Sequence, residues 1–218
     1  MHVIFDLDGT LADTHPGIAE AFAAAMGEVL PQRSIPDFMR HIGPPVRHVF
    51  RQALACEDEA LLDALNAAFR HHYDNGCWQN SNPYPGIPGL LGFLNNHGVD
   101  CSVLTNKPAL PTAKIIDHLN LRPHFSAIIS ADSVAPGFPN KSEAAAHLFH
   151  LLKLEPAHTW LIGDSEDDAA AAAACGCRFA AAAYGYGQAH LQTRYPVHLT
   201  IHNIQRLHSH FHHPLSLP

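Results

Sequence analysis

Positive charge is scarce in this sequence. Lysine and arginine together number 13 against 20 aspartates and glutamates, which gives a formal net charge of −7 over 218 residues. Proteins that bind nucleic acids usually carry a basic face, so this balance argues against a nucleic-acid partner. Charged residues make up only 15% of the chain and hydrophobic residues 47%, a composition that excludes a disordered chain and allows a sizeable core.

Cysteine pairs and long apolar runs are also lacking. The five cysteines form no Cys-x-x-Cys motif and their number is odd, which favours reduced thiols and a cytoplasmic location over a disulfide framework. No apolar stretch approaches the roughly 20 residues that cross a bilayer, so no membrane partner is expected. The charged Asp6 follows the first apolar run at once, which predicts that no signal peptide precedes the first strand.

Short apolar runs alternate with helical patterns over most of the chain. The runs are continuous rather than alternating, as in parallel strands that are buried on both faces. The helical patterns end at glycines such as Gly98 and Gly176. This alternation predicts the α/β class, with a doubly wound parallel sheet. The predicted strands are 2–5, 100–104, 126–130, 159–162 and 178–183, and the predicted helices are 86–97, 142–152 with Ser142 as N-cap, and 168–175.

Residues 14–80 break this alternation. They contain no convincing strand, and apolar side chains at helical spacing mark three amphipathic helices, around 18–29, 46–54 and 61–69. We predict a helical module that is inserted after the first strand. The predicted domains are an α/β core of residues 1–13 and 84–218 and a helical cap of residues 14–83.

Polar side chains follow the predicted strands where each strand ends. Asp6 and Asp8 follow the first strand, Thr105 and Asn106 the second, Lys141 lies in a segment after the third, and Asp164 follows the fourth. Ligands of a doubly wound sheet bind outside the carboxyl ends of its strands, so these clusters should converge. The three aspartates are hard oxygen donors that suit Mg²⁺, and the ion would relieve the repulsion between them. One carboxylate could then attack phosphorus and a second could move a proton, while the other three residues stabilise phosphoryl charge.

Four segments carry a resemblance to a known family. "FDLDGTLADT", "LTNKP", the lysine of "GFPNKSEAA" and "IGDSEDD" resemble the four motifs of the haloacid dehalogenase-like phosphohydrolase superfamily. The helical insert resembles the small α-helical cap of that family, and "IGPPVRHVF" and "PYPGIPGLL" resemble its phosphoglycolate-phosphatase-like branch. The resemblance implies that Asp6 is the nucleophile and Asp8 the general acid and base. It also implies Mg²⁺ held by Asp6, the backbone carbonyl of Asp8 and Asp164.

The same resemblance implies roles for three more residues. Thr105 would bind the phosphoryl group and Lys141 would balance the charge of the nucleophile. Asp168 would lie near the metal and orient its waters or Lys141. Alternatives stay open at two of these positions: Asp167 for Asp168, and Lys107 or Lys114 for Lys141.

The leading hypothesis is a Mg²⁺-dependent phosphatase that acts on a small phosphorylated metabolite through an aspartyl-phosphate intermediate. Asp8 argues against a dehalogenase, which needs no leaving-group acid. The absence of lysine from residues 14–80 argues against a phosphonate hydrolase with a Schiff-base lysine in its cap. A phosphomutase, a nucleotide or pyrophosphate hydrolase of the same fold and a catalytically silent binding module are the alternatives.

Residues that would select the substrate are sought in the predicted cap. Arg47 and His48 are the candidates there, with a solvated helix face as the alternative for Arg47. Asn106 could donate to the phosphate or shape its loop. Phosphoglycolate, a sugar phosphate, a nucleotide and pyrophosphate all remain candidate substrates, and a monomer and a homodimer both remain open. The C-terminal histidines are interpreted as incidental residues of an exposed tail, with a transition-metal site as the alternative: His202, His208, His210, His212 and His213.

Overall fold

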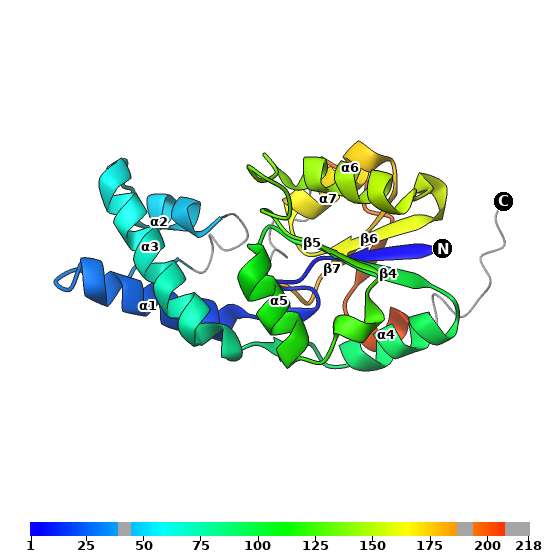
Figure 1. Cartoon of the computed structure of the whole chain (residues 1–218), viewed down its shortest axis with the longest axis horizontal. Helices are drawn as coiled ribbons and strands as arrows, with labels where there is room; N and C mark the ends of the chain where they lie inside the picture. The colour runs from blue at the N-terminus through cyan, green and yellow to red at the C-terminus, as the bar shows by residue number, and fades with distance from the viewer. Residues whose placement is uncertain (39–44, 187–193, 208–218) are drawn as a thin grey trace.

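A six-stranded sheet forms the centre of the protein (Figure 1). The computed structural model describes residues 1–38, 45–186 and 194–207. All neighbouring strands in the sheet are parallel, in the order β5-β4-β1-β6-β7-β8. The predicted α/β class with a parallel sheet is confirmed. The strands are β1 His2–Phe5, β4 Asp100–Leu104, β5 Ala127–Ile129, β6 Thr159–Gly163, β7 Arg178–Ala182 and β8 Leu199–Ile201.

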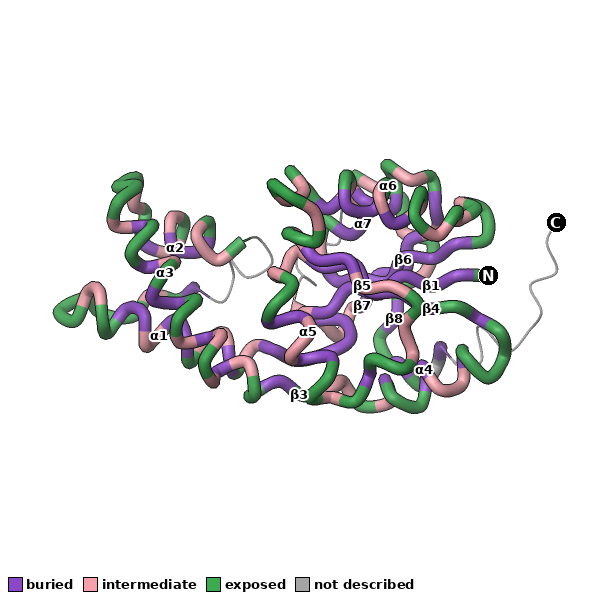
Figure 2. Tube along the Cα trace, in the orientation of Figure 1, coloured by how far each residue is buried: buried purple, intermediate pink, exposed green. Residues whose placement is uncertain are grey.

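The central strand β1 shows why these apolar runs form buried strands. Val3 lies opposite Cys101 on β4 and Trp160 on β6. Successive side chains point to opposite faces, so Val3 and Phe5 enter one core and Ile4 the other. Both faces are covered by helices, α4 and α5 on one and α6 and α7 on the other, and Figure 2 shows the strands buried between them. These helices are α4 Ile87–Asn96, α5 Ala109–His118, α6 Lys141–Leu152 and α7 Glu166–Cys175.

Three further helices stand beyond the carboxyl ends of the strands, on the left of Figure 1. They are α1 His15–Val29, α2 Val46–Leu54 and α3 Glu59–Asn75, at the positions predicted for the helical insert. Aromatic rings fill the space between them. The ring of Phe22 on α1 stacks on Phe38 at 3.9 Å and on Phe50 of α2 at 4.2 Å between centroids. Because aromatic side chains bury large apolar areas, this layer holds the helices together.

A two-stranded antiparallel ribbon lies where the chain enters and leaves these helices. β2 (Ala12–Asp13) pairs with β3 (Asn82–Pro83), with Ala12 opposite Pro83 and Asp13 opposite Asn82. The predicted boundaries after residue 13 and before residue 84 fall at this ribbon. The division into core and cap stays a prediction.

Several elements differ from the sequence-based expectations. The strands β2, β3 and β8 and the helix α5 were not predicted, nor were the 3₁₀ turns Cys77–Gln79, Arg122–His124, Pro156–His158 and Ile204–Arg206. The predicted N-cap Ser142 is wrong, because the side chain of Asn140 accepts the hydrogen bond from the Glu143 amide and α6 begins at Lys141. Across the three described ranges, every helix is too short or too polar to cross a membrane.

Candidate active site

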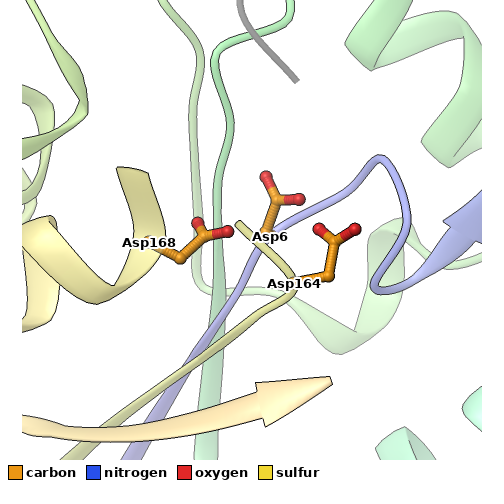
Figure 3. A group of neighbouring side chains, drawn as sticks. All are labelled: Asp6, Asp164 and Asp168. Atoms are coloured by element: carbon orange, nitrogen blue, oxygen red, sulfur yellow. The ribbon is translucent and has the colours of Figure 1, made fainter. Parts of the chain in front are cut away.

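Three buried carboxylates lie together at the carboxyl ends of β1 and β6 (Figure 3). Asp6 follows β1, Asp164 follows β6, and Asp168 lies in the first turn of α7. Each offers an oxygen atom, and these oxygens are all within 4.8 Å of one another. The most accessible of the three residues, Asp6, is only 5% exposed. The expected convergence of the first and fourth strand ends is found here.

Glycines allow these acids to approach so closely. A Cβ on Gly9, whose φ is +82°, would lie 2.3 Å from Oδ2 of Asp164. A Cβ on Gly163 would lie 2.2 Å from Cγ of Asp168. A side chain at either position would therefore displace a carboxylate from the cluster.

The ammonium of Lys141 lies against two of the three acids. Its Nζ is 2.5 Å from Oδ1 of Asp6 and 2.6 Å from Oδ1 of Asp168, and 4% of the side chain is exposed. Burial by itself would lower the pKa of Lys141, but Asp168 and Asp6 outweigh it and raise the pKa well above its ordinary value. Burial raises the pKa of Asp6, and Lys141 opposes this only in part. The alternative Lys114 instead donates to the carbonyl of Asp74, at 2.7 Å.

Asp168, rather than its neighbour Asp167, faces Lys141. The other oxygen of Asp168 accepts hydrogen bonds from the amide and the hydroxyl of Ser165, at 3.0 and 2.6 Å. The Ser165 hydroxyl in turn accepts from the Asp168 amide, which completes a capping box at the start of α7. Asp167 accepts from the Asn106 side chain at 2.8 Å. The helix start therefore fixes the carboxylate that holds Lys141.

Asp8 has partners of its own. Its Oδ1 accepts a short hydrogen bond from the Thr14 hydroxyl and lies 3.0 Å from Nζ of Lys107. The Asp8 side chain is 22% exposed and that of Lys107 only 8%. Burial alone would lower the pKa of Lys107, but Asp8 and Tyr73 raise it above its ordinary value. Lys107, an alternative for the role of Lys141, thus pairs with the other acid of the "DLD" segment.

The loop after β4 brings Thr105 and Asn106 to the same place. The Thr105 amide donates to the carbonyl of Ile129 at 2.9 Å, and its hydroxyl accepts from the Lys107 amide at 3.1 Å. Both Thr105 and Asn106 line a cavity that also contains Asp6, and their contact with a phosphoryl group stays a prediction.

This cavity, of about 380 Å³, lies between the strand ends and the α1–α3 helices. Its volume falls in the usual range for small-molecule sites. The strand ends supply the acids and Lys141, and the helices supply a largely apolar wall that includes Phe22, Val49 and Phe69.

Arg47 also lines the cavity, but its guanidinium is engaged elsewhere. It lies 2.7 Å from Oδ1 of Asp63 and 2.5 Å from Oε2 of Glu59, both on α3. These pairs join α2 to α3, so the substrate contact predicted for Arg47 competes with a structural role. His48 is exposed and is not among the residues that line the cavity.

The model of one family, described as haloacid dehalogenase-like hydrolase, matches residues 3–182. The chain belongs to the haloacid dehalogenase-like hydrolases. A phosphoglycolate phosphatase from Chromobacterium violaceum is 33% identical over 179 residues, 78% of each chain. Tyrosine-protein kinase PtkA from Mycobacterium tuberculosis is 34% identical over 170 residues, which are 76% of this chain and 56% of the kinase. Among solved structures, a haloacid dehalogenase-like hydrolase from Streptococcus pneumoniae superposes with a TM-score of 0.86 and 25% identity, covering 96% of this chain and 97% of that one.

These similarities confirm the resemblance read from the four haloacid dehalogenase-like motifs and place the chain in the phosphoglycolate-phosphatase-like branch. The predicted enzyme class, a phosphatase, is confirmed with it.

Sequence reasoning missed Tyr186, which connects the hydrolase site to the start of α1. Its amide donates to Oδ2 of Asp164 at 2.6 Å, and its hydroxyl accepts from the amides of Thr14 and His15 at 2.7 and 2.9 Å. The same hydroxyl donates to Oδ1 of Asp13 at 2.7 Å. The Gly185-Tyr186 pair, one residue after the predicted strand 178–183, was the signal available for it.

Most of the C-terminal histidines named as an alternative metal site are not among the described residues. His202 is exposed just after β8. His208, His210, His212 and His213 lie outside the described residues, so both interpretations of these histidines stay open.

Proposed function

We propose that the protein is a Mg²⁺-dependent phosphatase that hydrolyses a small phosphomonoester, of the phosphoglycolate kind, through an aspartyl-phosphate on Asp6. The observation that carries the proposal is the balance of charge in the site. Four carboxylates, those of Asp6, Asp8, Asp164 and Asp168, meet two ammonium groups. The fully ionised site therefore has two excess negative charges, which one divalent cation would balance.

The donor set fits magnesium. Mg²⁺ prefers a few carboxylates together with water and substrate phosphate, and the oxygens of Asp6, Asp164 and Asp168 lie close enough to share an ion. Asp6 and Asp164 are the candidate side-chain ligands, because Asp168 is already held by Ser165 and Lys141. Bound there, the ion would polarise the phosphoryl oxygens and offset the charge that develops on them.

Each side chain then has a task in a two-step hydrolysis. Lys141 holds Oδ1 of Asp6, which leaves Oδ2 to attack phosphorus as the ester P–O bond breaks. Asp8 gives its proton to the departing alkoxide. Asp8 next takes a proton from water, whose oxygen attacks phosphorus and regenerates the Asp6 carboxylate with release of inorganic phosphate. Thr105 lines the same cavity and would contact the phosphoryl oxygens.

The test uses p-nitrophenyl phosphate. We expect hydrolysis with Mg²⁺, loss of hydrolysis after treatment with EDTA, and recovery when Mg²⁺ is restored. Asp6→Asn should abolish turnover while the thermal unfolding transition remains cooperative. Turnover at the wild-type rate in Asp6→Asn, or in the metal-free protein, would refute the proposal.

A further inference from the structure

The hydroxyl of Tyr73 is a buried polar group without a partner. Tyr73 lies near the end of α3, is 3% exposed, and lines the cavity above the acids. Its hydroxyl oxygen makes no hydrogen bond of good geometry with any described residue. Lys107 and Ser81 lie near enough to interact with it, and both offset part of the rise in its pKa that burial causes. Folded proteins keep few such groups, because an unpaired hydroxyl is costly to bury. A hydrogen-bond partner supplied by a bound ligand would explain why the Tyr73 hydroxyl is present at this position.

A positive charge lies next to this hydroxyl. The ammonium of Lys107 is 4.8 Å from the centre of the Tyr73 ring and 3.0 Å from Oδ1 of Asp8. Lys107 comes from the loop after β4 and Tyr73 from α3, so the pair joins the two walls of the cavity. Lys107 can only donate hydrogen bonds, and the Tyr73 hydroxyl also has one to donate. The group that meets both must be an acceptor.

The remaining polar groups on the α3 wall limit what that acceptor is. Arg70 lines the cavity one turn before Tyr73, and Asp74 lies 3.7 Å from its guanidinium. Asn66 is uncharged, and the rest of the wall is mostly apolar. When Asp8 is protonated, the corner at Lys107 and Tyr73 is therefore a compact cationic site beside an apolar surface.

We propose that the Tyr73 hydroxyl and the Lys107 ammonium bind a carboxylate on the carbon end of the substrate, while its phosphoryl group meets Asp6. The inference rests on the proposed phosphatase function and assigns two residues to substrate selection. It also accounts for the charge of Lys107 in the first step, the attack of Asp6 on phosphorus. When Asp8 carries the proton that it gives to the leaving group, Lys107 has lost its anionic partner. A substrate carboxylate replaces that partner at this stage.

The experiment compares phosphoglycolate with ethyl phosphate, which has a methyl group in place of the carboxylate. We expect wild type to prefer phosphoglycolate in kcat/KM by at least about tenfold. In Tyr73→Phe, kcat/KM for phosphoglycolate should fall by about 10- to 100-fold, the range for a hydrogen bond to a charged group. The value for ethyl phosphate should stay within about twofold, because that substrate has no group for the hydroxyl to bind.

Two controls separate substrate selection from a structural role. Tyr195→Phe removes a hydroxyl from a residue that packs against the other face of the sheet and does not line the cavity, and it should leave both substrates unchanged. The thermal midpoint of ligand-free Tyr73→Phe should equal or exceed that of wild type, because the lost hydroxyl had no partner. If the Tyr73 hydroxyl had a structural role instead, its loss in Tyr73→Phe would lower the thermal midpoint.

Three results would overturn the inference. These are equal losses for both substrates in Tyr73→Phe, no preference for phosphoglycolate in wild type, and 2-hydroxyethyl phosphate serving as well as phosphoglycolate. If wild type hydrolyses no ester, the proposed function fails. Calorimetric binding of phosphoglycolate to Asp6→Asn, with and without Tyr73→Phe, then still decides whether the carboxylate is bound here.

Discussion

Replacing Lys141 by methionine tests the charge balance of the site most directly. The ammonium lies 2.5 and 2.6 Å from the buried carboxylates of Asp6 and Asp168, and the Lys141 side chain is 4% exposed. The substitution therefore removes the positive charge that both acids share in a poorly solvated site. Removing one partner of a buried ion pair typically costs about 3–5 kcal/mol of unfolding free energy. For a chain of this size, that corresponds to a fall in the thermal midpoint of roughly 6–20 °C. The measurement is urea and thermal unfolding at pH 7 in EDTA.

The pH dependence of the Lys141→Met defect gives a second check. Burial raises the pKa of Asp6, and the variant removes the group that opposes this rise. The folded variant then holds protons that the unfolded chain releases above the ordinary Asp value of about 3.8. Its stability relative to wild type should therefore improve as the pH falls from 7 towards 5. Mg²⁺ should also reduce the defect, because the ion restores positive charge.

A matched change at the exposed Lys153, at the end of α6, should shift stability by less than about 0.5 kcal/mol. A Lys141→Met protein as stable as wild type at pH 7 in EDTA would refute the reasoning. So would a defect that is the same at pH 7 and at pH 5.

Three further predictions concern other residues. Asp8→Asn should slow hydrolysis of an alkyl phosphate far more than that of p-nitrophenyl phosphate, since a poor leaving group needs the proton; equal slowing would contradict the acid role. Gly185→Ala should lower stability by about 1–3 kcal/mol, because its Cβ would lie 2.3 Å from the Gly9 carbonyl oxygen. Gly92→Ala on α4 should raise stability by up to about 1 kcal/mol, because its added Cβ would have no atom within 4 Å. Chemical denaturation of both variants and of wild type measures these changes. Burial lowers the pKa of His2 to about 4. The free energy of unfolding of wild type should therefore fall by on the order of 2–3 kcal/mol relative to that of His2→Gln between pH 6.5 and pH 4. The same pH dependence of unfolding free energy in both proteins would contradict this.

The core of the fold could be predicted because parallel strands that are buried on both faces appear in the sequence as continuous apolar runs. β1 and β6 are continuous apolar runs that end in aspartates, and the parallel arrangement then requires Asp6 and Asp164 to meet. The helix α5 was missed because prolines obscure it. Pro111 occupies the third position of that helix, where the missing amide hydrogen breaks no helical hydrogen bond.

The details of the site depend on contacts that sequence spacing does not contain. Lys107 lies just after β4 and Lys141 begins α6, and the packing of the loops before them decides which of the two faces Asp6. Arg47 finds Glu59 and Asp63 on a different helix, so its engagement could not be inferred from α2 alone. A buried tyrosine in an amphipathic helix is usually a core residue, which concealed the unpaired hydroxyl of Tyr73.

The position of β1 in the sheet has a consequence for biosynthesis. This strand precedes the other five strands of the sheet in the chain, yet its two neighbours are residues 100–104 and 159–163. At about 5–20 residues per second, the N-terminal strand waits roughly 8–30 seconds for its second neighbour. During that interval at least one edge of this apolar strand stays unpaired, and pairings so distant in the chain form slowly. Nascent chains that end before residue 159 should accordingly depend on holding factors, because one edge of β1 has no partner strand in them.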